Sequence, residues 1–387
     1  MAAMSDRREA SATCIRTAGR VVVKVGTSSI TNDAGRIDPP RMWAIARGLL
    51  SLERASGLTP VLVSSGAGAA GRQRLGISLP LTLPDMQAAA AVGQTLLMHD
   101  WERAFAPRPV AQLLLSADDV HDRERYVNAK NALQASLRLG ALPVVNENDS
   151  VATQELKLGD NDTLSAWVAY LVDAATLVIL TDVDGLYDAD PRRVPGASRI
   201  DEVRDLAAAE TAAGGVGSGR GTGGMVTKLR AARIAHDAGI ETWIAGGGGE
   251  ALEALARGEA PGTRIVPPRG RTRARKAWLA QQPIAGQVVV DDGAVAALAS
   301  GRSLLPRGVT AVIGDFGFGD AVEVVAPGGG VVARGLVNYG AEALLSIAGR
   351  HTSEIAELLG AKDFDEVVHR DNLAWLAVRR GVDASEA

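Results

Sequence analysis

Cysteine is almost absent from this sequence, since Cys14 is the only one among its 387 residues. A single thiol excludes an internal disulfide and a metal site built from several thiolates. Low cysteine usage is typical of proteins that work in a reducing compartment, so the sequence predicts a cytoplasmic protein.

Long apolar runs are also missing. The longest examples, "LVIL" and "AAAAVG", fall far short of the ~20 residues that a membrane-spanning helix needs. Residues 1–18 mix arginine with acidic residues and lack the apolar core of a secretory signal, so we interpret them as a flexible leader. We therefore expect a soluble protein without a membrane partner.

No charge of one sign dominates, because 41 basic residues face 45 acidic ones and the formal net charge is −4. One local exception is "RGRTRARK", which carries five basic residues in eight. Binding of nucleic acid through this segment is an alternative function, but the overall acidic balance favours a solvated connector.

Signals for a metal site or a nucleophilic triad are lacking as well. The five histidines show no ligand spacing with one another, and no Ser-His-Asp arrangement is present. The run "DVDGLYDAD" lacks the glycine and the glutamate of a calcium-binding EF-hand loop. No metal-ligating residues are therefore predicted.

What the first two thirds of the chain do contain is an alternation of short apolar runs and longer amphipathic stretches. Runs such as "RVVVKVG", "PVLVSS" and "ATLVILTD" predict strands buried on both faces, and the stretches between them have helical spacing. This pattern predicts an α/β domain with a mainly parallel open sheet between helices.

After residue 262 the pattern changes to turn-rich, strand-like segments, among them residues 286–295, 308–314 and 321–339. Their spacing predicts a small β-barrel. We therefore predict a flexible leader at 1–18, an α/β domain at 19–266, a linker at 267–282, a β-domain at 283–374 and a C-terminal tail at 375–387.

Four glycine-rich or small-residue loops follow predicted strands: "VKVGTSS", "SSGAGAAG", "TDVDGLYDADP" and "GTGGMVTK". In open α/β sheets ligands bind at the carboxyl ends of the strands, where such loops meet. With Lys24 and Lys228, they predict a cradle for a polyphosphate. Taken alone, "SSGAGAAG" is better explained by a tight turn with close helix packing than by anion binding.

The stretch "NENDSVATQELKLGDND" concentrates carboxylates and amides. Asn161 or Asp162 could cap the helix that follows, but one cap and one loop do not require so many polar groups. An anionic loop near a phosphate cradle suits a substrate with an ammonium group, or a magnesium ion.

Together these motifs resemble the amino acid kinase family, and in particular its bacterial members that phosphorylate glutamate. The resemblance covers residues 19 to 373 and rests on "VVKVGTSS", "SSGAGAAGRQRLG", "DRERYVNAKNAL", "PVVNENDSVAT", "KLGDNDTLSA", "LTDVDGLYDADPR" and "GTGGMVTKLRAA". "DGAVAALASGRSLLPRGV" and "GDAVEV" are similar to the PUA domain that many of these kinases carry at the C-terminus. Ser64 and Val226 depart from the commoner threonine and serine of the family.

The resemblance implies a role for each matching residue. As catalytic residues it implies Lys24, Lys228 near the transferred phosphoryl group, and Asp162, which would orient the two lysines. The implied binding residues for the amino acid are Ser65, Gly66, Ala67, Asp149 and Asn161. Those implied for the nucleotide are Lys24, Gly26, Thr181, Asp182, Thr222, Gly223, Gly224, Met225, Val226, Thr227 and Lys228.

The resemblance also implies the reaction and its partners. ATP, with Mg²⁺, would phosphorylate the γ-carboxylate of L-glutamate to L-glutamyl 5-phosphate, the first step of proline biosynthesis. Feedback inhibition by L-proline and a homo-oligomer, dimer or tetramer, are further expectations, and the reactive product suggests hand-over to a reductase. A catalytically inactive homologue is a third possibility, which the presence of Lys24, Asp162 and Lys228 disfavours.

Overall fold

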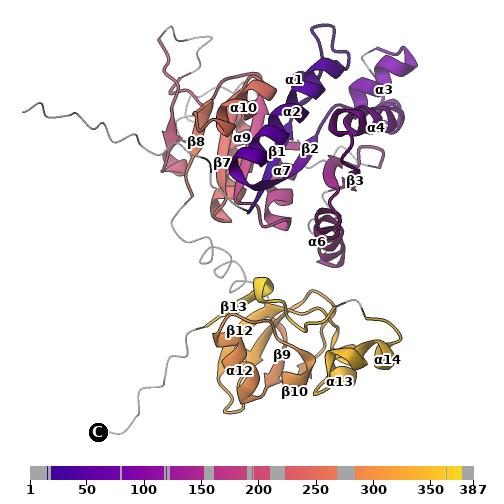
Figure 1. The fold of residues 1–387 in the computed structure, drawn as a ribbon, viewed down its shortest axis with the longest axis vertical. Helices are drawn as coiled ribbons and strands as arrows, with labels where there is room; N and C mark the ends of the chain where they lie inside the picture. Colours follow the sequence, from indigo (N-terminus) through magenta and orange to yellow (C-terminus); the bar gives the residue numbers. More distant parts are fainter. Residues whose placement is uncertain are drawn as a thin grey trace, which may run out of the picture. The chain divides into compact units, whose positions relative to one another are not determined.

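The computed structural model describes residues 15, 19–78, 81–116, 119, 123–151, 161–189, 194, 196–209, 223–267, 284–362 and 364–376. The chain divides into two compact units, residues 1–269 and 270–387. Figure 1 shows the helices and strands of both units. The predicted linker 267–282 lies outside the described residues except for residue 267, so its bounds stay a prediction.

The first unit alternates strands and helices, as predicted. Its described elements are β1 (Gly19–Val25), α1 (Thr27–Ile30), α2 (Pro39–Ser56), β2 (Leu58–Ser64), α3 (Ala67–Leu75), α4 (Leu83–Phe105), β3 (Val110–Leu115), α6 (Arg123–Arg138), β4 (Leu142–Glu147), α7 (Asn161–Leu171), β5 (Thr176–Thr181), β6 (Glu202–Val203), α9 (Gly223–Asp237), β7 (Glu241–Gly246), α10 (Gly249–Ala256) and β8 (Gly262–Ile265).

These strands form one sheet in the order β3-β4-β2-β1-β5-β7-β8-β6. All neighbouring pairs are parallel except β7 and β8, which are antiparallel. β1 therefore lies in the middle of the sheet, and the carboxyl ends of β2, β1 and β5 meet at one edge. Ligands of open α/β sheets bind at such an edge.

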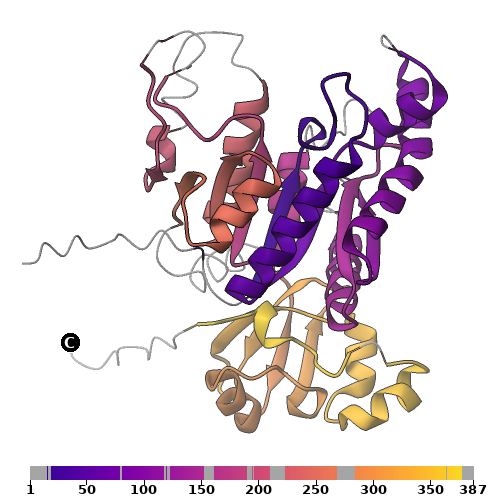
Figure 2. The same cartoon turned by 45° about the horizontal axis from the view of Figure 1, so that its top comes forward.

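Helices cover both faces of this sheet. On one face Val21 and Val23 pack in a cluster with residues of α2, α4 and α10, and Figures 1 and 2 show α2 and α10 side by side. On the other face Val22 packs with residues of α6, α7 and α9. The near-continuous apolar strands predicted from the sequence are thus buried on both sides.

The helix ends follow local signals in the sequence. α2 begins after Asp38, whose side chain accepts a hydrogen bond from the backbone N–H of Arg41, and ends at Gly57 with φ +72°. α4 begins with a capping box between Thr82 and Asp85. The caps at Asp38 and Thr82 fix where the two helices begin, and the left-handed Gly57 ends α2 and turns the chain into β2.

The predicted leader contains one described residue, Ile15. Its side chain is 3% exposed and belongs to the apolar cluster that α2 and α4 cover. At this residue the chain contacts the core of the first unit.

The second unit contains one five-stranded sheet in the order β10-β9-β11-β12-β13. Its described elements are β9 (Ile284–Val290), α12 (Asp292–Ala299), β10 (Val309–Gly314), β11 (Ala321–Val325), β12 (Val331–Leu336), α13 (Ala341–Ile347), α14 (Ile355–Leu359) and β13 (Leu373–Trp375), with 3-10 turns at Pro306–Gly308, Thr352–Glu354 and Arg370–Asn372.

Two details of this unit differ from the prediction. The segment 286–295 is not strand-like throughout, because α12 begins at Asp292, where the side chain of Asp291 caps the helix by accepting from the N–H of Ala294 at 2.7 Å. β13 reaches Trp375, one residue beyond the predicted domain end.

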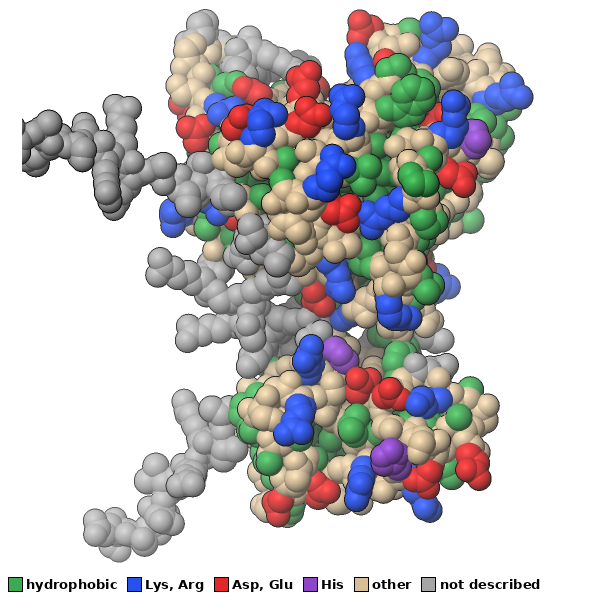
Figure 3. Space-filling model, in the orientation of Figure 1, with side chains coloured by type: hydrophobic (Ala, Val, Ile, Leu, Met, Phe, Trp, Pro, Cys, Tyr) green, Lys and Arg blue, Asp and Glu red, His purple; other side chains and the backbone are tan. Residues whose placement is uncertain are grey.

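Basic and acidic side chains are interspersed on the face of the first unit that Figure 3 shows. Within the described part of the chain, no helix is both long enough and apolar enough to span a membrane.

Candidate active site

Lys24 is the only charged residue among the last five residues of β1, and its direction follows from the alternation of side chains along a strand. It shares a face with Val22, which packs in the cluster of α7 and α9. The lysine is only 4% exposed. Since an unpaired buried ammonium group is costly, Lys24 needs an anionic partner on this face.

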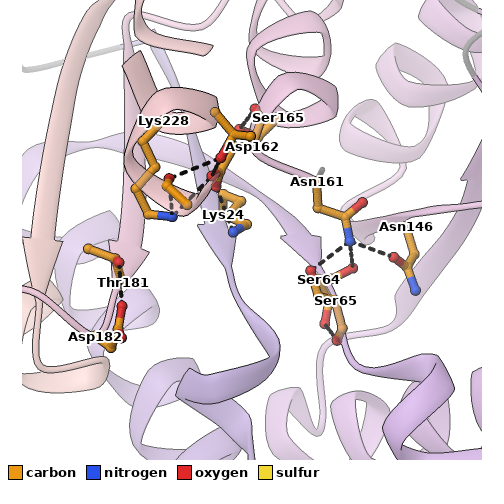
Figure 4. A network of polar contacts seen from close by, with 12 residues as sticks. Lys24, Ser64, Ser65, Asn146, Asn161, Asp162, Ser165, Thr181, Asp182 and Lys228 are labelled. Carbon is orange, nitrogen blue, oxygen red and sulfur yellow. Dashed lines mark hydrogen bonds and ion pairs between the residues drawn. The ribbon is translucent and has the colours of Figure 1, made fainter. Parts of the chain in front are cut away.

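Asp162, in the first turn of α7, is this partner. Its side chain is fully buried, with Oδ1 2.6 Å from Lys24 Nζ and Oδ2 3.1 Å from Lys228 Nζ. Figure 4 shows the three side chains converging from β1, α7 and α9. One buried carboxylate thus holds two ammonium groups in place, and these three side chains together carry an excess of positive charge.

Lys228 is held from its own helix as well. Its Nζ donates to the carbonyl oxygen of Gly224 at 3.1 Å, and the hydroxyl of Thr227 donates to Asp162 Oδ2 at 3.0 Å. Met225 packs on a small apolar cluster, whereas Val226 is 55% exposed. The start of α9 is therefore tied to the start of α7, although 65 residues separate Thr227 from Asp162.

Glycines leave space beside both ammonium groups. A Cβ atom at Gly26 would lie 3.5 Å from Lys24 Nζ, and one at Gly224 would lie 3.9 Å from Lys228 Nζ. Bare backbone therefore borders each cation, which lets a large anion such as a phosphate approach closely.

Asn161, next to Asp162, points to the other side of the site. Its Nδ2 donates to Ser65 Oγ at 2.6 Å, to the carbonyl oxygen of Ser64 at 3.3 Å and to Asn146 Oδ1 at 3.1 Å. Consecutive residues of α7 thus serve two different clusters, one with the lysines and one with the end of β2 (Figure 4).

A pocket of about 280 Å³ lies beside this second cluster. Its lining is Ala67, Ala90, Ala91, Gln94, Thr95, Gln112, Leu114, Glu147, Asn148, Asp149 and Ser150. The predicted substrate residues Ala67 and Asp149 are among them. Because Ser65 and Gly66 directly precede Ala67, the structure brings all five residues predicted for the amino acid to one region.

Gly66 has a structural reason to be glycine. Its φ is +108°, and a Cβ atom there would lie 2.7 Å from Cδ1 of Ile30. A little further along, a Cβ atom at Gly71 would lie 1.6 Å from the carbonyl oxygen of Ala89. The motif "SSGAGAAG" therefore combines a turn at the pocket with close packing of α3 on α4, as both interpretations of it require.

Thr181 ends β5, on the opposite side of β1 from β2, and Asp182 follows it directly. The Thr181 hydroxyl donates to Asp182 Oδ1 at 3.0 Å. Both residues line a second pocket of about 380 Å³, together with Ser28, Ser29, Arg41, Ala44, Ile45, Gly247, Gly248, Gly249 and Glu250. In the loop that follows, the hydrogen bond from Tyr187 to Asp184 raises the pKa of the Tyr187 hydroxyl above its ordinary value.

Sheet order relates these features to one another. The first pocket follows β2 and β4, the second follows β5 and β7, and Lys24 ends the strand between β2 and β5. This arrangement suits transfer of a charged group between two ligands, one on each side of β1.

Most of the predicted site residues are described by the structure; Thr222 lies outside the described residues. Sequence reasoning did not single out Asn146 and Gln94, nor the second pocket's Ser28, Arg41 and Gly247–Gly249. Asn146 stands inside the quoted run "NEND" and could have been found there, but a glutamine in the alanine-rich α4 carries no such signal.

The chain belongs to the amino acid kinase family, whose model matches residues 19–246, and the model of the PUA domain matches residues 286–359. These matches confirm the fold predicted from the motifs. The chain is 50% identical over 367 residues to the glutamate 5-kinase of Moorella thermoacetica, covering 93% of this chain and 97% of that protein. It is 48% identical over 371 residues to the glutamate 5-kinase of Myxococcus xanthus, covering 94% and 98%. Within the family, its place is among the glutamate 5-kinases.

Proposed function

We propose that this protein transfers the γ-phosphoryl group of ATP to the side-chain carboxylate of L-glutamate, forming L-glutamyl 5-phosphate at the first step of proline biosynthesis. The observation that carries this proposal is the buried carboxylate of Asp162 between Lys24 and Lys228, next to Asn161 on the amino-acid side. The names of the relatives agree with it.

The acceptor needs no general base. A glutamate side chain has a pKa of about 4.3, so its carboxylate is already an ionised nucleophile at neutral pH. The obstacle is repulsion, because this carboxylate must approach a phosphoryl group that is itself highly anionic. Catalysis then consists mainly of positioning and neutralisation of charge.

The two lysines supply this neutralisation. Asp162 fixes both ammonium groups, so that they need not reorganise when charge builds up during transfer. Its single negative charge leaves the pair of lysines with net positive charge toward the phosphates. Lys24 and Lys228 would hold phosphate oxygens, and Gly26 and Gly224 would leave room for them.

The nucleotide would extend from the lysines toward Thr181 and Asp182 and the pocket that they line. The residues Gly223 to Lys228 form the start of α9, where backbone N–H groups favour an anion. Thr222, just before this helix, remains a predicted contact.

Mg²⁺ would enter with the nucleotide. Among the described residues no three His, Cys, Asp or Glu side chains come together in a way that could hold a metal ion. Phosphate oxygens and water are ligands that Mg²⁺ readily accepts, and it would supply further neutralisation of phosphate charge. We accordingly assign no protein ligand to it.

Glutamate would be selected by groups of opposite polarity in the first pocket. Asp149 lines this pocket and offers a carboxylate for the α-ammonium group, while backbone N–H groups at the start of α3, near Ala67, suit a carboxylate. Kinases of the same fold whose substrates carry no ammonium group have no use for an acidic residue at this position.

We further propose that the enzyme is cytoplasmic, that L-proline inhibits it, that it forms a homo-oligomer (dimer or tetramer) and that it passes its product to a reductase. The last expectation follows from chemistry, because an acyl phosphate hydrolyses readily in water. Light scattering of the purified protein measures the oligomer, and assays with added L-proline measure the inhibition.

Trapping with hydroxylamine tests the reaction itself. An acyl phosphate reacts with hydroxylamine to give a hydroxamate, so incubation with Mg-ATP and L-glutamate should yield a hydroxamate in step with ADP. ADP release without a glutamate-dependent hydroxamate would contradict the proposal.

A further inference from the structure

Gln94 of α4 carries a buried hydrogen-bond donor that no group in the described part of the chain accepts. Its side chain is 8% exposed and lines the first pocket, and its Nε2 is buried without a hydrogen-bond partner among the described residues. An unsatisfied buried N–H group is costly, so such a group at a pocket indicates a ligand acceptor.

The orientation of this amide follows from fixed donors around it. The backbone N–H of Glu147 can only donate, and it donates to Asn146 Oδ1 at 2.9 Å. Asn146 must therefore turn its Nδ2 toward Gln94, and this donor reaches Gln94 Oε1 at 2.7 Å. Since Oε1 is used in this way, Gln94 presents Nε2 as its free end.

Asn161 is oriented by the same logic with the opposite result. The carbonyl oxygen of Ser64 can only accept, and it accepts from Asn161 Nδ2 at 3.3 Å. Asn161 Oδ1 is then left buried without a hydrogen-bond partner among the described residues. The amide chain Asn161–Asn146–Gln94 therefore ends in one free acceptor and one free donor.

A free acceptor and a free donor match the two charged groups on the α-carbon of an amino acid. We propose that Gln94 Nε2 donates a hydrogen bond to the α-carboxylate of the substrate, and that Asn146 acts as the positioning residue that fixes this polarity. The inference rests on the proposed function, since it names how the same site recognises glutamate.

The α-carboxylate is the group concerned, rather than the γ-carboxylate that accepts the phosphoryl group. In Figure 4, Asn146 lies on the side of Asn161 away from Lys24 and Lys228. Gln94 is hydrogen-bonded to Asn146, the member of the amide chain on this far side. The reacting carboxylate must lie at the lysine end, so the donor of Gln94 faces the other end of the substrate.

The test combines two variants with a truncated ligand. Gln94→Met removes the amide at similar length, and Gln94→Glu keeps the shape and an acceptor for Asn146 while replacing the donor by an anionic oxygen. 4-Aminobutyrate retains the ammonium group and the γ-carboxylate of glutamate but lacks the α-carboxylate. Gln287→Met, in the second unit, is the matched control.

Both Gln94 variants should raise the KM for L-glutamate by about 10- to 100-fold, the value of one charge-assisted hydrogen bond, with the KM for ATP within about twofold. The inhibition constant of 4-aminobutyrate should stay within about twofold, because this ligand never meets Gln94. If 4-aminobutyrate does not inhibit the unmodified enzyme, the test is whether the KM for L-glutamate rises while the KM for ATP does not.

Two results would overturn the assignment of Gln94 and leave the proposed function intact. One is an unchanged KM for glutamate, and the other is an equal rise in the KM for glutamate and in the inhibition constant of 4-aminobutyrate. Absence of glutamate-dependent turnover in the unmodified enzyme would instead remove the proposed function and this inference with it. Thermal unfolding checks that each variant folds. If Gln94→Met does not fold, Gln94→Glu, which keeps the shape of the side chain, tests the inference.

Discussion

Lys24 and Lys228 share one carboxylate: Asp162 Oδ1 lies 2.6 Å from the first ammonium group, and Oδ2 lies 3.1 Å from the second. The two lysines come from a strand and a helix that are far apart in the sequence. Asp162 therefore fixes the relative position of the two ammonium groups, and we expect catalysis to depend on this carboxylate.

Replacement of this carboxylate should affect catalysis first. Asp162→Asn keeps the shape but removes the charge that fixes both lysines, so kcat should fall by about 10²-fold or more. Removing one partner from a buried ion pair also costs about 3–5 kcal/mol of stability, so chemical unfolding must be measured beside the rate. Asp201→Asn, at an exposed ion pair with Arg199, is the control. A folded Asp162→Asn variant with ordinary kcat would contradict the assigned role.

The two lysines should not act independently. Lys24→Met and Lys228→Met should each lower kcat/KM for ATP by about 10²-fold or more, because each removes a positive charge that faces the phosphates. The double variant should lose less than the product of the two single losses, since both lysines act through Asp162. Steady-state kinetics of the four proteins measure this coupling, with Lys362→Met in the second unit as control. Fully multiplicative losses would show that the lysines work separately.

The acidic residue of the first pocket should govern recognition of the amino acid. Asp149→Asn should raise the KM for glutamate much more than the KM for ATP, because it removes the anion that faces the α-ammonium group. Kinetics with each substrate varied in turn give both values. Equal effects on the two KM values would argue against the assigned role of Asp149.

Gly66 links stability to the same pocket. Gly66→Ala should destabilise the protein by about 2 kcal/mol or more, because alanine is disfavoured at φ +108° and its Cβ would lie 2.7 Å from Ile30. Gly76→Ala is the matched control, since it has φ +66° but meets no atom within 4 Å and should cost only about 1 kcal/mol. Urea unfolding of both variants compares the two costs. An equal loss of unfolding free energy in the two variants would mean that the Ile30 side chain moves aside and that the close contact does not matter.

Parts of this site could be predicted from the sequence because they depend on local patterns. A lysine in an otherwise apolar strand and a glycine directly after it can be recognised without knowing the order of the strands, so the sequence alone predicts Lys24 and Gly26 as site residues. The missed helix α12 also has a local signal, since Asp291 precedes the helix-favouring run "AVAALA" and caps it. The valines that precede Asp291 instead predict a strand that continues past this residue.

Other parts depend on contacts between distant residues. The meeting of Asp162 with both lysines requires the order of strands in the sheet, which the motifs alone do not specify. Gln94 is harder still, because its role follows only from the direction of an amide that a backbone N–H on β4 determines. A glutamine on the exposed face of a helix would look the same in the sequence.

The most direct measurement of the central claim is a comparison of acceptors. ADP release with Mg-ATP is measured for L-glutamate, carbamate, a nucleoside monophosphate and isopentenyl phosphate, which together represent the acceptors of different amino acid kinases. We expect turnover with L-glutamate alone, accompanied by a hydroxamate when hydroxylamine is present. Turnover with one of the other acceptors and none with L-glutamate would contradict it.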